Sequence, residues 1–233
     1  MVKAHMKILC ITHVDFETPG IIQDWAHTNN HDFKICKPHK GDNCLSNSDF
    51  DFLIIMGGPQ SACNLAQDPY LFDEVKLIKQ VIDQNKIVLG FCLGAQLIGH
   101  ALDAPASRGP EKEIGVFPIS LNELGKEDLI FKDFNATFNA IHWHNDMPGI
   151  TPQAQILAYS AGCPRQIIRY TNKVYGLQCH LEITKEGIAT MIDACPDDLK
   201  PSTYTQTKDQ LLSNDYQSIN GLMILILDKL IQQ

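Results

Sequence analysis

A chain of 233 residues, 44% of them hydrophobic, can bury a sizeable core and is commonly organised as one α/β unit, so we expect a single domain over residues 1–233. The formal net charge of −8, without any run of Lys or Arg, argues against a surface for nucleic acid or for an anionic membrane. The apolar stretch near the N-terminus is too short for a secretory signal, and Asp228 and Lys229 interrupt the one near the C-terminus, so we expect a cytoplasmic protein without a membrane span.

The first half of the chain alternates short apolar runs with amphipathic stretches. Buried strands are predicted at residues 7–12, 51–59 and 86–91. One helical pattern begins at Pro19, and a second runs from Pro69 to Gln84. Continuous apolar strands separated by helices are typical of a parallel sheet that is covered on both faces.

After about residue 110 the pattern changes to shorter strands, several of which alternate polar and apolar residues. They are predicted at residues 113–121, 156–160, 166–170 and 174–182. Such strands indicate antiparallel or edge additions to the central sheet. A polar loop and a terminal helix with Ile219, Met223 and Ile226 on one stripe follow. The expected fold is an α/β, three-layer, flavodoxin-like arrangement with a mostly parallel sheet, helices on both faces and extra antiparallel strands in the C-terminal half.

The eight cysteines are scattered and form no Cys-x-x-Cys pair. Their spacing indicates neither a zinc knuckle nor a disulfide framework, and we expect most of them to be reduced and buried. The chain also has no P-loop motif, and no cofactor is expected.

Cys92 lies between Gly90 and Gly94, where the third buried strand meets a helix-like run. This spacing is that of a nucleophile elbow, in which a strand turns abruptly into a helix and presents one side chain at the tip. A Cβ at either glycine would collide with the neighbouring strand or helix. Unpaired N–H groups at the helix start favour a thiolate there. The alternative is a buried cysteine at an ordinary strand-to-helix junction.

His180 and Glu182 occupy alternate positions of the last predicted strand, so their side chains should share a face. The carboxylate could orient the imidazole while the imidazole exchanges protons with Cys92. The alternative is that His180 and Glu182 are two half-exposed strand residues that share a face but have no joint role.

Gly57, Gly58 and Pro59 end the second buried strand, at the sheet edge where the Cys92 turn is also expected. Because the glycines carry no side chains, a backbone N–H of this turn can face an oxyanion, together with the N–H of Leu93. The alternative is a simple tight turn.

Alternation in the segment 142–146 places His142, His144 and Asp146 on one side of a strand. Two histidines at this spacing could bind a metal ion. The sequence reveals no third ligand, however, and no metal site is expected.

Together, these motifs resemble those of class I glutamine amidotransferases. The run from Gly90 to Gln96 resembles the family signature G-x-C-x-G-x-Q, His180 and Glu182 resemble its catalytic pair, and residues 57–59 resemble its oxyanion loop. The similarity runs from about Lys7 to Thr184 and is greatest to stand-alone, GMP-synthase-like members.

One motif departs from the family pattern, which often reads Q-F-H-P-E around the histidine. Cys179 and Leu181 replace the aromatic residue and the proline. Both should lie on the strand face opposite His180, so we expect the packing beneath the histidine to change and the chemistry to be retained.

The resemblance implies hydrolysis of the side-chain amide of L-glutamine to glutamate and ammonia through a γ-glutamyl thioester on Cys92. It implies His180 and Glu182 as the other members of a catalytic triad. It further implies an oxyanion hole of Gly58 and Leu93 and substrate contacts from Gly57, Gln96, and Asn145 or Asp146. Since no acceptor-activating motif is fused to the chain, ammonia would pass to a separate synthase.

Three other functions remain open from the sequence. A γ-glutamyl amide or peptide hydrolase would use the same triad. An α/β-hydrolase of the dienelactone type would use Asp146 as its acid in place of Glu182. A non-catalytic regulatory subunit would keep the fold without turnover.

Overall fold

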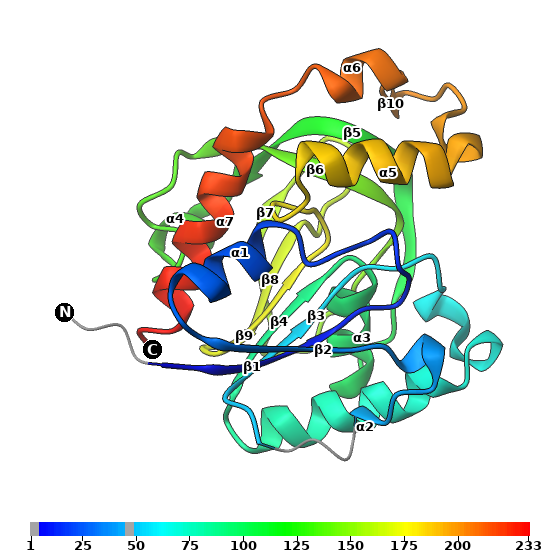
Figure 1. Ribbon diagram of the computed structural model, residues 1–233. Coiled ribbons are helices and arrows are strands. Elements are labelled where there is room, and N and C mark those ends of the chain that lie inside the picture. The colour runs from blue at the N-terminus through cyan, green and yellow to red at the C-terminus, as the bar shows by residue number, and fades with distance from the viewer. Residues whose placement is uncertain (1–4, 45–48) are drawn as a thin grey trace.

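A ten-stranded sheet runs through the described part of the protein, residues 5–44 and 49–233 of the computed structural model (Figure 1). Its strands are β1 (Lys7–Ile11), β2 (Asp32–Cys36), β3 (Phe52–Ile55), β4 (Ile87–Phe91), β5 (Ser107–Leu121), β6 (Thr137–Met147), β7 (Gln155–Tyr159), β8 (Ile167–Thr171), β9 (Val174–Leu177) and β10 (Tyr204–Thr205). The α-helices are α1 (Ile21–Thr28), α2 (Tyr70–Asp83), α3 (Leu93–Ala101), α4 (Glu123–Glu127), α5 (Lys185–Ala194), α6 (Lys208–Leu212) and α7 (Tyr216–Leu230). Short 3₁₀ segments cover Pro38–Lys40, Ala62–Gln67 and Pro196–Leu199.

Five parallel strands form one half of the sheet, in the order β2-β1-β3-β4-β9. Leu9, Leu53 and Val88 illustrate why these strands are central, since all three side chains are fully buried or nearly so. Apart from the late position of β9 in the chain, the order is that of flavodoxin-like folds. Because the strands are parallel, their carboxyl ends meet at one edge of the sheet, where ligands bind in such folds.

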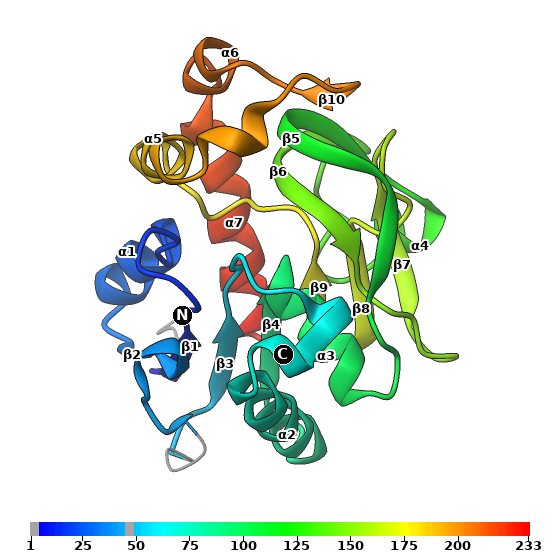
Figure 2. The same ribbon diagram turned by 90° about the vertical axis from the view of Figure 1, so that its right-hand side faces the viewer.

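The other half of the sheet is antiparallel and comes from the later part of the chain. Strands β9, β8, β7 and β5 pair in that order, and the long strands β5 and β6 form a further antiparallel pair. Figure 2 shows β5, β6 and β7 on the side of the sheet away from β1 and β2. This half supplies a second wall beside the carboxyl edge of the parallel strands.

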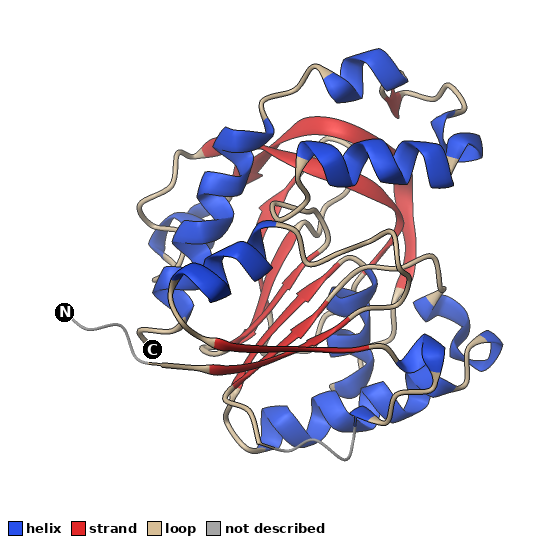
Figure 3. Ribbon diagram, viewed as in Figure 1, coloured by secondary structure: helices blue, strands red, loops and turns tan. Residues whose placement is uncertain are grey.

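Helices cover both faces of the parallel half (Figure 3). Alternate side chains of β1 and β3 point to opposite faces: Ile8 and Ile54 pack in a core with α1, α5 and α7, whereas Leu9 and Leu53 pack in a core with α2 and α3. The expected three-layer α/β fold, with a mostly parallel sheet and antiparallel strands in the C-terminal half, is confirmed. Among the described residues, no helix combines the length and the apolar character needed to cross a bilayer.

Strand β9 ends at Leu177, five residues before the end predicted from the sequence. Beyond it the chain leaves β4 and β8, and His180 exchanges two backbone hydrogen bonds with Ile141 of β6. The segment that contains His180 and Glu182 therefore bridges to the antiparallel half instead of continuing as a strand.

Cys36 and Cys44 form a disulfide, which the sequence analysis did not predict. The turn at Pro38–Lys40 brings their Cα atoms to 6.0 Å, although the two residues lie eight positions apart. The other six cysteines are free, but only Cys10, Cys163 and Cys179 among them are buried, so the expectation that most cysteines are both reduced and buried holds for three of the eight.

Candidate active site

Cys92 occupies a strained turn between β4 and α3. Its backbone has φ 48° and ψ −107°, a conformation that side chains with a Cβ rarely adopt and that costs about 1–3 kcal/mol. Ideal Cβ atoms on the flanking glycines would meet backbone: at Gly90 the carbonyl carbon of Gly94 at 2.5 Å, and at Gly94 the carbonyl oxygen of Ile55 in β3. Both glycines are thus needed for the close packing of α3 on the sheet, as expected for a nucleophile elbow.

The imidazole of His180 is held by the carboxylate of Glu182. Nδ1 of His180 lies 2.6 Å from Oε1 of Glu182, and the backbone N–H of Leu181 donates to Oε2 at 2.9 Å. Both side chains are at most 2% exposed. Burial disfavours the charged ring, but Glu182 and a hydrogen bond with Cys92 outweigh it and hold the pKa of His180 well above its usual range.

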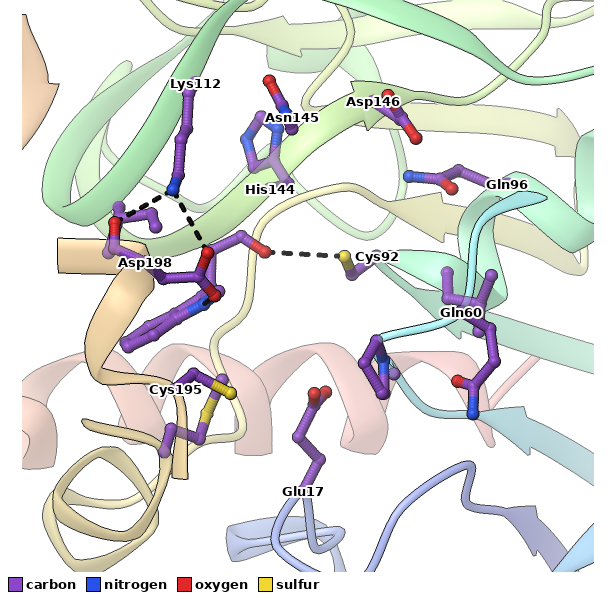
Figure 4. Close-up of a pocket in the computed structure, with 16 residues that line it drawn as sticks. Glu17, Gln60, Cys92, Gln96, Lys112, His144, Asn145, Asp146, Cys195 and Asp198 are labelled. Carbon is purple, nitrogen blue, oxygen red and sulfur yellow. Dashed lines mark hydrogen bonds and ion pairs between the residues drawn. The ribbon is translucent and has the colours of Figure 1, made fainter. Parts of the chain in front are cut away.

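Cys92 and His180 meet beside Gly57. An ideal Cβ on Gly57 would lie 2.6 Å from Oε2 of Glu17, 3.2 Å from Cε1 of His180 and 3.5 Å from Cβ of Cys92, so a side chain at this position would crowd the space between the thiol and the imidazole. The thiol remains half-buried and donates to the carbonyl oxygen of Trp143 at 3.8 Å (Figure 4). Sulfur, imidazole and carboxylate are therefore assembled in the order that a cysteine hydrolase uses.

The loop after β3 is anchored by a buried ion pair that the sequence analysis missed. Nδ1 of His13 donates to the carbonyl oxygen of Gly57 at 2.9 Å, and Nε2 lies 2.8 Å from Oε2 of Glu74 in α2. Burial opposes the positive charge, but Glu74 together with the Gly57 carbonyl raises the pKa of His13. Neither side chain is detectable from its own segment, because His13 lies 44 positions from Gly57 and 61 from Glu74.

A pocket opens above Cys92 at the carboxyl edge of the sheet. Of the residues singled out in the sequence, those that line it are Cys92, Gly58, Pro59, Leu93, Gln96, His144, Asn145 and Asp146. Gly57 does not line this pocket, although it is next to both Cys92 and His180.

The side-chain amide of Gln96 is 4% exposed and donates to Oε1 of Gln178 at 2.9 Å. In Figure 4, Gln96 and Asp146 lie on the same side of Cys92, across the pocket from Glu17. Trp143 also lines the pocket.

Further lining residues come from segments that carried no motif. Glu17 reaches the pocket from the loop after β1, and burial raises the pKa of its carboxyl. Lys112 of β5 donates to the backbone oxygen of Asp198 at 2.9 Å, and Trp143 donates to Oδ2 of Asp198 at 3.0 Å (Figure 4). A carboxylate in the loop after the first buried strand was the sequence signal that could have pointed to Glu17.

Comparison with known proteins places this geometry in a family. The family model for glutamine amidotransferase class-I matches residues 17–192. The chain belongs to the class I glutamine amidotransferases. The matched segment begins at Glu17 and includes Cys92, His180 and Glu182.

Two similar proteins and one solved structure illustrate the relationship. The glutamine amidotransferase-like protein YfeJ of Salmonella typhimurium is 38% identical over 232 residues, 97% of either chain. One of the subunits of the glutamine-hydrolyzing GMP synthase of Saccharolobus solfataricus is 31% identical over 165 residues, 67% of this chain and 80% of that protein. The crystal structure of a Thermotoga maritima glutamine amidotransferase shares the fold, with a TM-score of 0.88 at 24% identity, over 99% of this chain and 100% of that one.

Membership of this family excludes the dienelactone-type α/β-hydrolase among the alternatives left by the sequence. The geometry agrees, because the carboxylate on Nδ1 of His180 is Glu182. Asp146 instead lies 3.5 Å from Arg108 at the rim of the pocket.

Proposed function

We propose that this class I glutamine amidotransferase hydrolyses the side-chain amide of L-glutamine to glutamate and ammonia through a γ-glutamyl thioester on Cys92. The observation that carries the proposal is the short contact between His180 and Glu182, 2.6 Å, next to a half-buried thiol at a strained elbow. Family membership supports the reaction class, and the residue roles are inferred from the geometry.

In the first half-reaction, the sulfur of Cys92 attacks the amide carbon of glutamine, and the thiol proton moves to His180. The carbonyl oxygen becomes an oxyanion, for which the N–H groups of Gly58 and Leu93 are the proposed donors. Removing one such donor commonly lowers the rate 10²–10³-fold. His180 then gives its proton to the departing nitrogen, so that ammonia leaves and the thioester remains.

In the second half-reaction, a water molecule loses a proton to His180 and attacks the thioester carbon. The carbon–sulfur bond breaks, glutamate leaves, and the proton returns to Cys92. Glu182 acts throughout by holding Nδ1 of His180, which keeps Nε2 available for the proton transfers.

The pocket walls suggest how the substrate is held. We assign the α-amino group of glutamine to the side of the pocket where Asn145 and Asp146 lie, and the reacting amide to the neighbourhood of Gln96. Gly57 contributes by leaving space between Cys92 and His180. We further propose that ammonia passes to a separate synthase, by analogy with the relative that is one of the subunits of GMP synthase.

Two measurements on the purified chain test the proposal. We expect glutamate to be released from glutamine, and 6-diazo-5-oxo-norleucine, a glutamine-mimicking electrophile, to label Cys92, as located by mass spectrometry of peptides. Glu182→Gln should lower the rate of labelling strongly, whereas Glu186→Gln, an exposed neighbour on α5, should not. Labelling of another cysteine would contradict the site.

Comparison of substrates separates the remaining alternatives. Turnover of γ-glutamyl anilides or peptides in preference to glutamine would indicate a γ-glutamyl hydrolase. Labelling of Cys92 without release of glutamate from any of these substrates would indicate a regulatory subunit or a chain that needs its synthase partner.

A further inference from the structure

A polar cluster is buried in the antiparallel half of the sheet, separate from the triad. It consists of Glu113 on β5, His142 and His144 on β6, and Gln166 immediately before β8. Glu113, His142 and Gln166 are 0% exposed, and His144 is 6% exposed. Such a concentration of ligand-type side chains away from water requires a positive partner or a complete set of hydrogen bonds.

The four atoms that converge in this cluster define a compact tetrahedron. Oε2 of Glu113 lies 3.5 Å from Nδ1 of His142 and 3.2 Å from Nε2 of His144, and the two histidine nitrogens lie 3.4 Å apart. The fourth atom is the amide nitrogen Nε2 of Gln166. It lies 2.8 Å from the same carboxylate oxygen and 3.2 Å from each histidine nitrogen. The centre of a tetrahedron with edges of about 3.2 Å lies about 2.0 Å from every corner, which is the length of Zn–N and Zn–O bonds.

Hydrogen bonds around the cluster orient its members toward this centre. Ser160 donates to Oε2 of Glu113 at 2.9 Å, and the N–H of Gly162 donates to Oε1 at 3.2 Å. Nε2 of His142 faces the carbonyl oxygen of Phe117 at 3.4 Å, which favours a proton on that nitrogen and leaves the lone pair of Nδ1 directed inward. Such outer contacts commonly fix metal-binding carboxylates and imidazoles.

Hydrogen bonds within the protein do not satisfy the cluster. Oε1 of Gln166 and Nδ1 of His144 are both buried without a hydrogen-bond partner. At the same time, the amide nitrogen of Gln166 has four neighbours at hydrogen-bond distance but only two hydrogens. A half-turn of this amide would bring its unpartnered oxygen to the fourth corner of the tetrahedron.

We propose that Glu113, His142, His144 and Gln166 form a structural binding site for a divalent cation, with Zn²⁺ as the ion that the donor set and spacing fit best. Two imidazoles and two oxygen donors in tetrahedral array match zinc, whereas calcium and magnesium take six or more oxygen ligands. No metal site was expected from the sequence, where no third ligand is evident. The fold supplies a third group, because it brings Glu113 to both histidines.

A structural role follows from the burial of the site and from its position. No corner of the tetrahedron is left for a substrate. The ion would join β5, β6 and the start of β8, and His144 of the site also lines the pocket above Cys92. A bound cation would therefore stiffen the wall that carries Asn145 and Asp146.

Metal content of the purified protein tests the site directly. We expect a Cys92→Ser variant, used so that the active-site thiol binds no zinc, to hold about one equivalent of zinc after refolding with Zn²⁺ and desalting. Zinc at 100-fold above its Kd should raise Tm by about 5–10 °C relative to protein stripped with a chelator. Cobalt in place of zinc should give the d–d absorption of a tetrahedral site without a thiolate charge-transfer band.

Substitution of His142 locates the ion. In the same background, His142→Gln should lose the bound zinc and the Tm shift, while His27→Gln, which changes an exposed histidine on α1, should retain both. The proposal is overturned if the Cys92→Ser protein neither retains zinc nor gains Tm, or if cobalt shows thiolate ligation. These readouts need no turnover, so they are independent of the proposed glutaminase activity. If His142→Gln does not fold, the zinc content, the Tm shift and the cobalt spectrum of the Cys92→Ser protein still test the site.

Discussion

Gly57 and Gly58 share a peptide unit whose carbonyl and N–H groups point in opposite directions. His13 donates to the Gly57 carbonyl at 2.9 Å, so the N–H of Gly58 is turned away from His13. Gly58 lines the pocket beside Cys92. We therefore infer that the buried pair of His13 and Glu74 is a positioning device for the proposed oxyanion hole.

Replacement of both members of this pair by leucine should lower kcat by about 10- to 100-fold, less than the loss of an oxyanion donor itself. The double variant His13→Leu/Glu74→Leu releases the Gly57 carbonyl but leaves no unpaired buried charge, which a leucine at only one of the two positions would create at a cost of about 3–5 kcal/mol. KM for glutamine should change little, because the anchor acts on the transition state. Steady-state kinetics of glutamate release measures both constants.

Glu74→Gln is the matched control for this pair. A neutral His13 can still donate from Nδ1 to Gly57 and accept at Nε2 from the new amide, so kcat should remain near the wild-type value. If the leucine variant folds and keeps full kcat, the positioning role is refuted. If Glu74→Gln is as impaired as the leucine variant, the charge on His13, and not its hydrogen bond to Gly57, is what matters.

Residues within one short motif could be predicted from the sequence, and residues in distant pairs could not. Cys92, His180 and Glu182 stand out because spacing of two to four residues fixes their local geometry. His13 and Glu113 belong to pairs whose partners lie 29 to 61 positions away, and the fold alone brings them together.

Helix α3 is the element on which the elbow depends, and it packs against β3 through Gly94. Elsewhere, Gly221 of α7 has no neighbour within 4 Å of an ideal Cβ. The same substitution therefore has opposite physical consequences in two helices of one protein. Where space is free, alanine stabilises a helix by about 1 kcal/mol relative to glycine. Where the site is already filled, the added methyl group overpacks it and costs about 1–3 kcal/mol.

Gly94→Ala should destabilise the protein by about 1–3 kcal/mol, and Gly221→Ala should stabilise it by up to about 1 kcal/mol. The first change presses a methyl group against the Ile55 carbonyl, and the second only removes unfolded-state freedom. Equilibrium unfolding in urea measures both free energies. Equal stability of the two variants would mean that α3 does not lie as close to β3 as described.

Elements with continuous apolar sequences were predicted well, and edge elements were not. The apolar runs of β1, β3 and β4 identify central strands, because both faces of each strand are buried. The predicted end of β3 was wrong, since the strand ends at Ile55, four residues before Pro59. Strand β2 was missed since it lies at the sheet edge, where its charged residues Asp32 and Lys34 are exposed. The early end of β9 arises from pairing between His180 and Ile141, a contact that no local pattern encodes.

At the scale of the whole molecule, helix α7 closes the fold although it lies beyond the segment that the family model matches. Nε1 of Trp25 in α1 donates to Asp228 of α7 at 2.8 Å, across 203 positions of the chain. Asn220 of α7 donates to the carbonyl oxygens of Leu181 and Ile183 at 2.8 and 3.0 Å. These two acceptors flank Glu182, so the last helix holds the segment that orients His180.

Removal of residues 215–233 should therefore unfold the protein, even though the motif residues and the whole matched segment remain. The core loses five side chains of α7 that are at most 3% exposed, namely Ile219, Met223, Ile226, Leu227 and Leu230. Each contributes about 1.5–3 kcal/mol when buried, and the sum is comparable to the roughly 5–15 kcal/mol stability of a typical domain. Far-UV circular dichroism and thermal melting should show no cooperative transition. Removal of Gln232 and Gln233 alone should retain the transition and lower Tm by at most a few degrees, because both residues are exposed and only Gln233 contacts Tyr175.

Asn220→Ala separates the two contributions of α7. It keeps the apolar stripe, so the variant should fold with a Tm lowered by a few degrees, but it frees the carbonyl groups beside Glu182. We expect kcat to fall while KM is largely retained, since the carboxylate that orients the proton carrier is displaced. If the chain without residues 215–233 folded and kept its normal kcat, α7 would neither complete the core nor support the site.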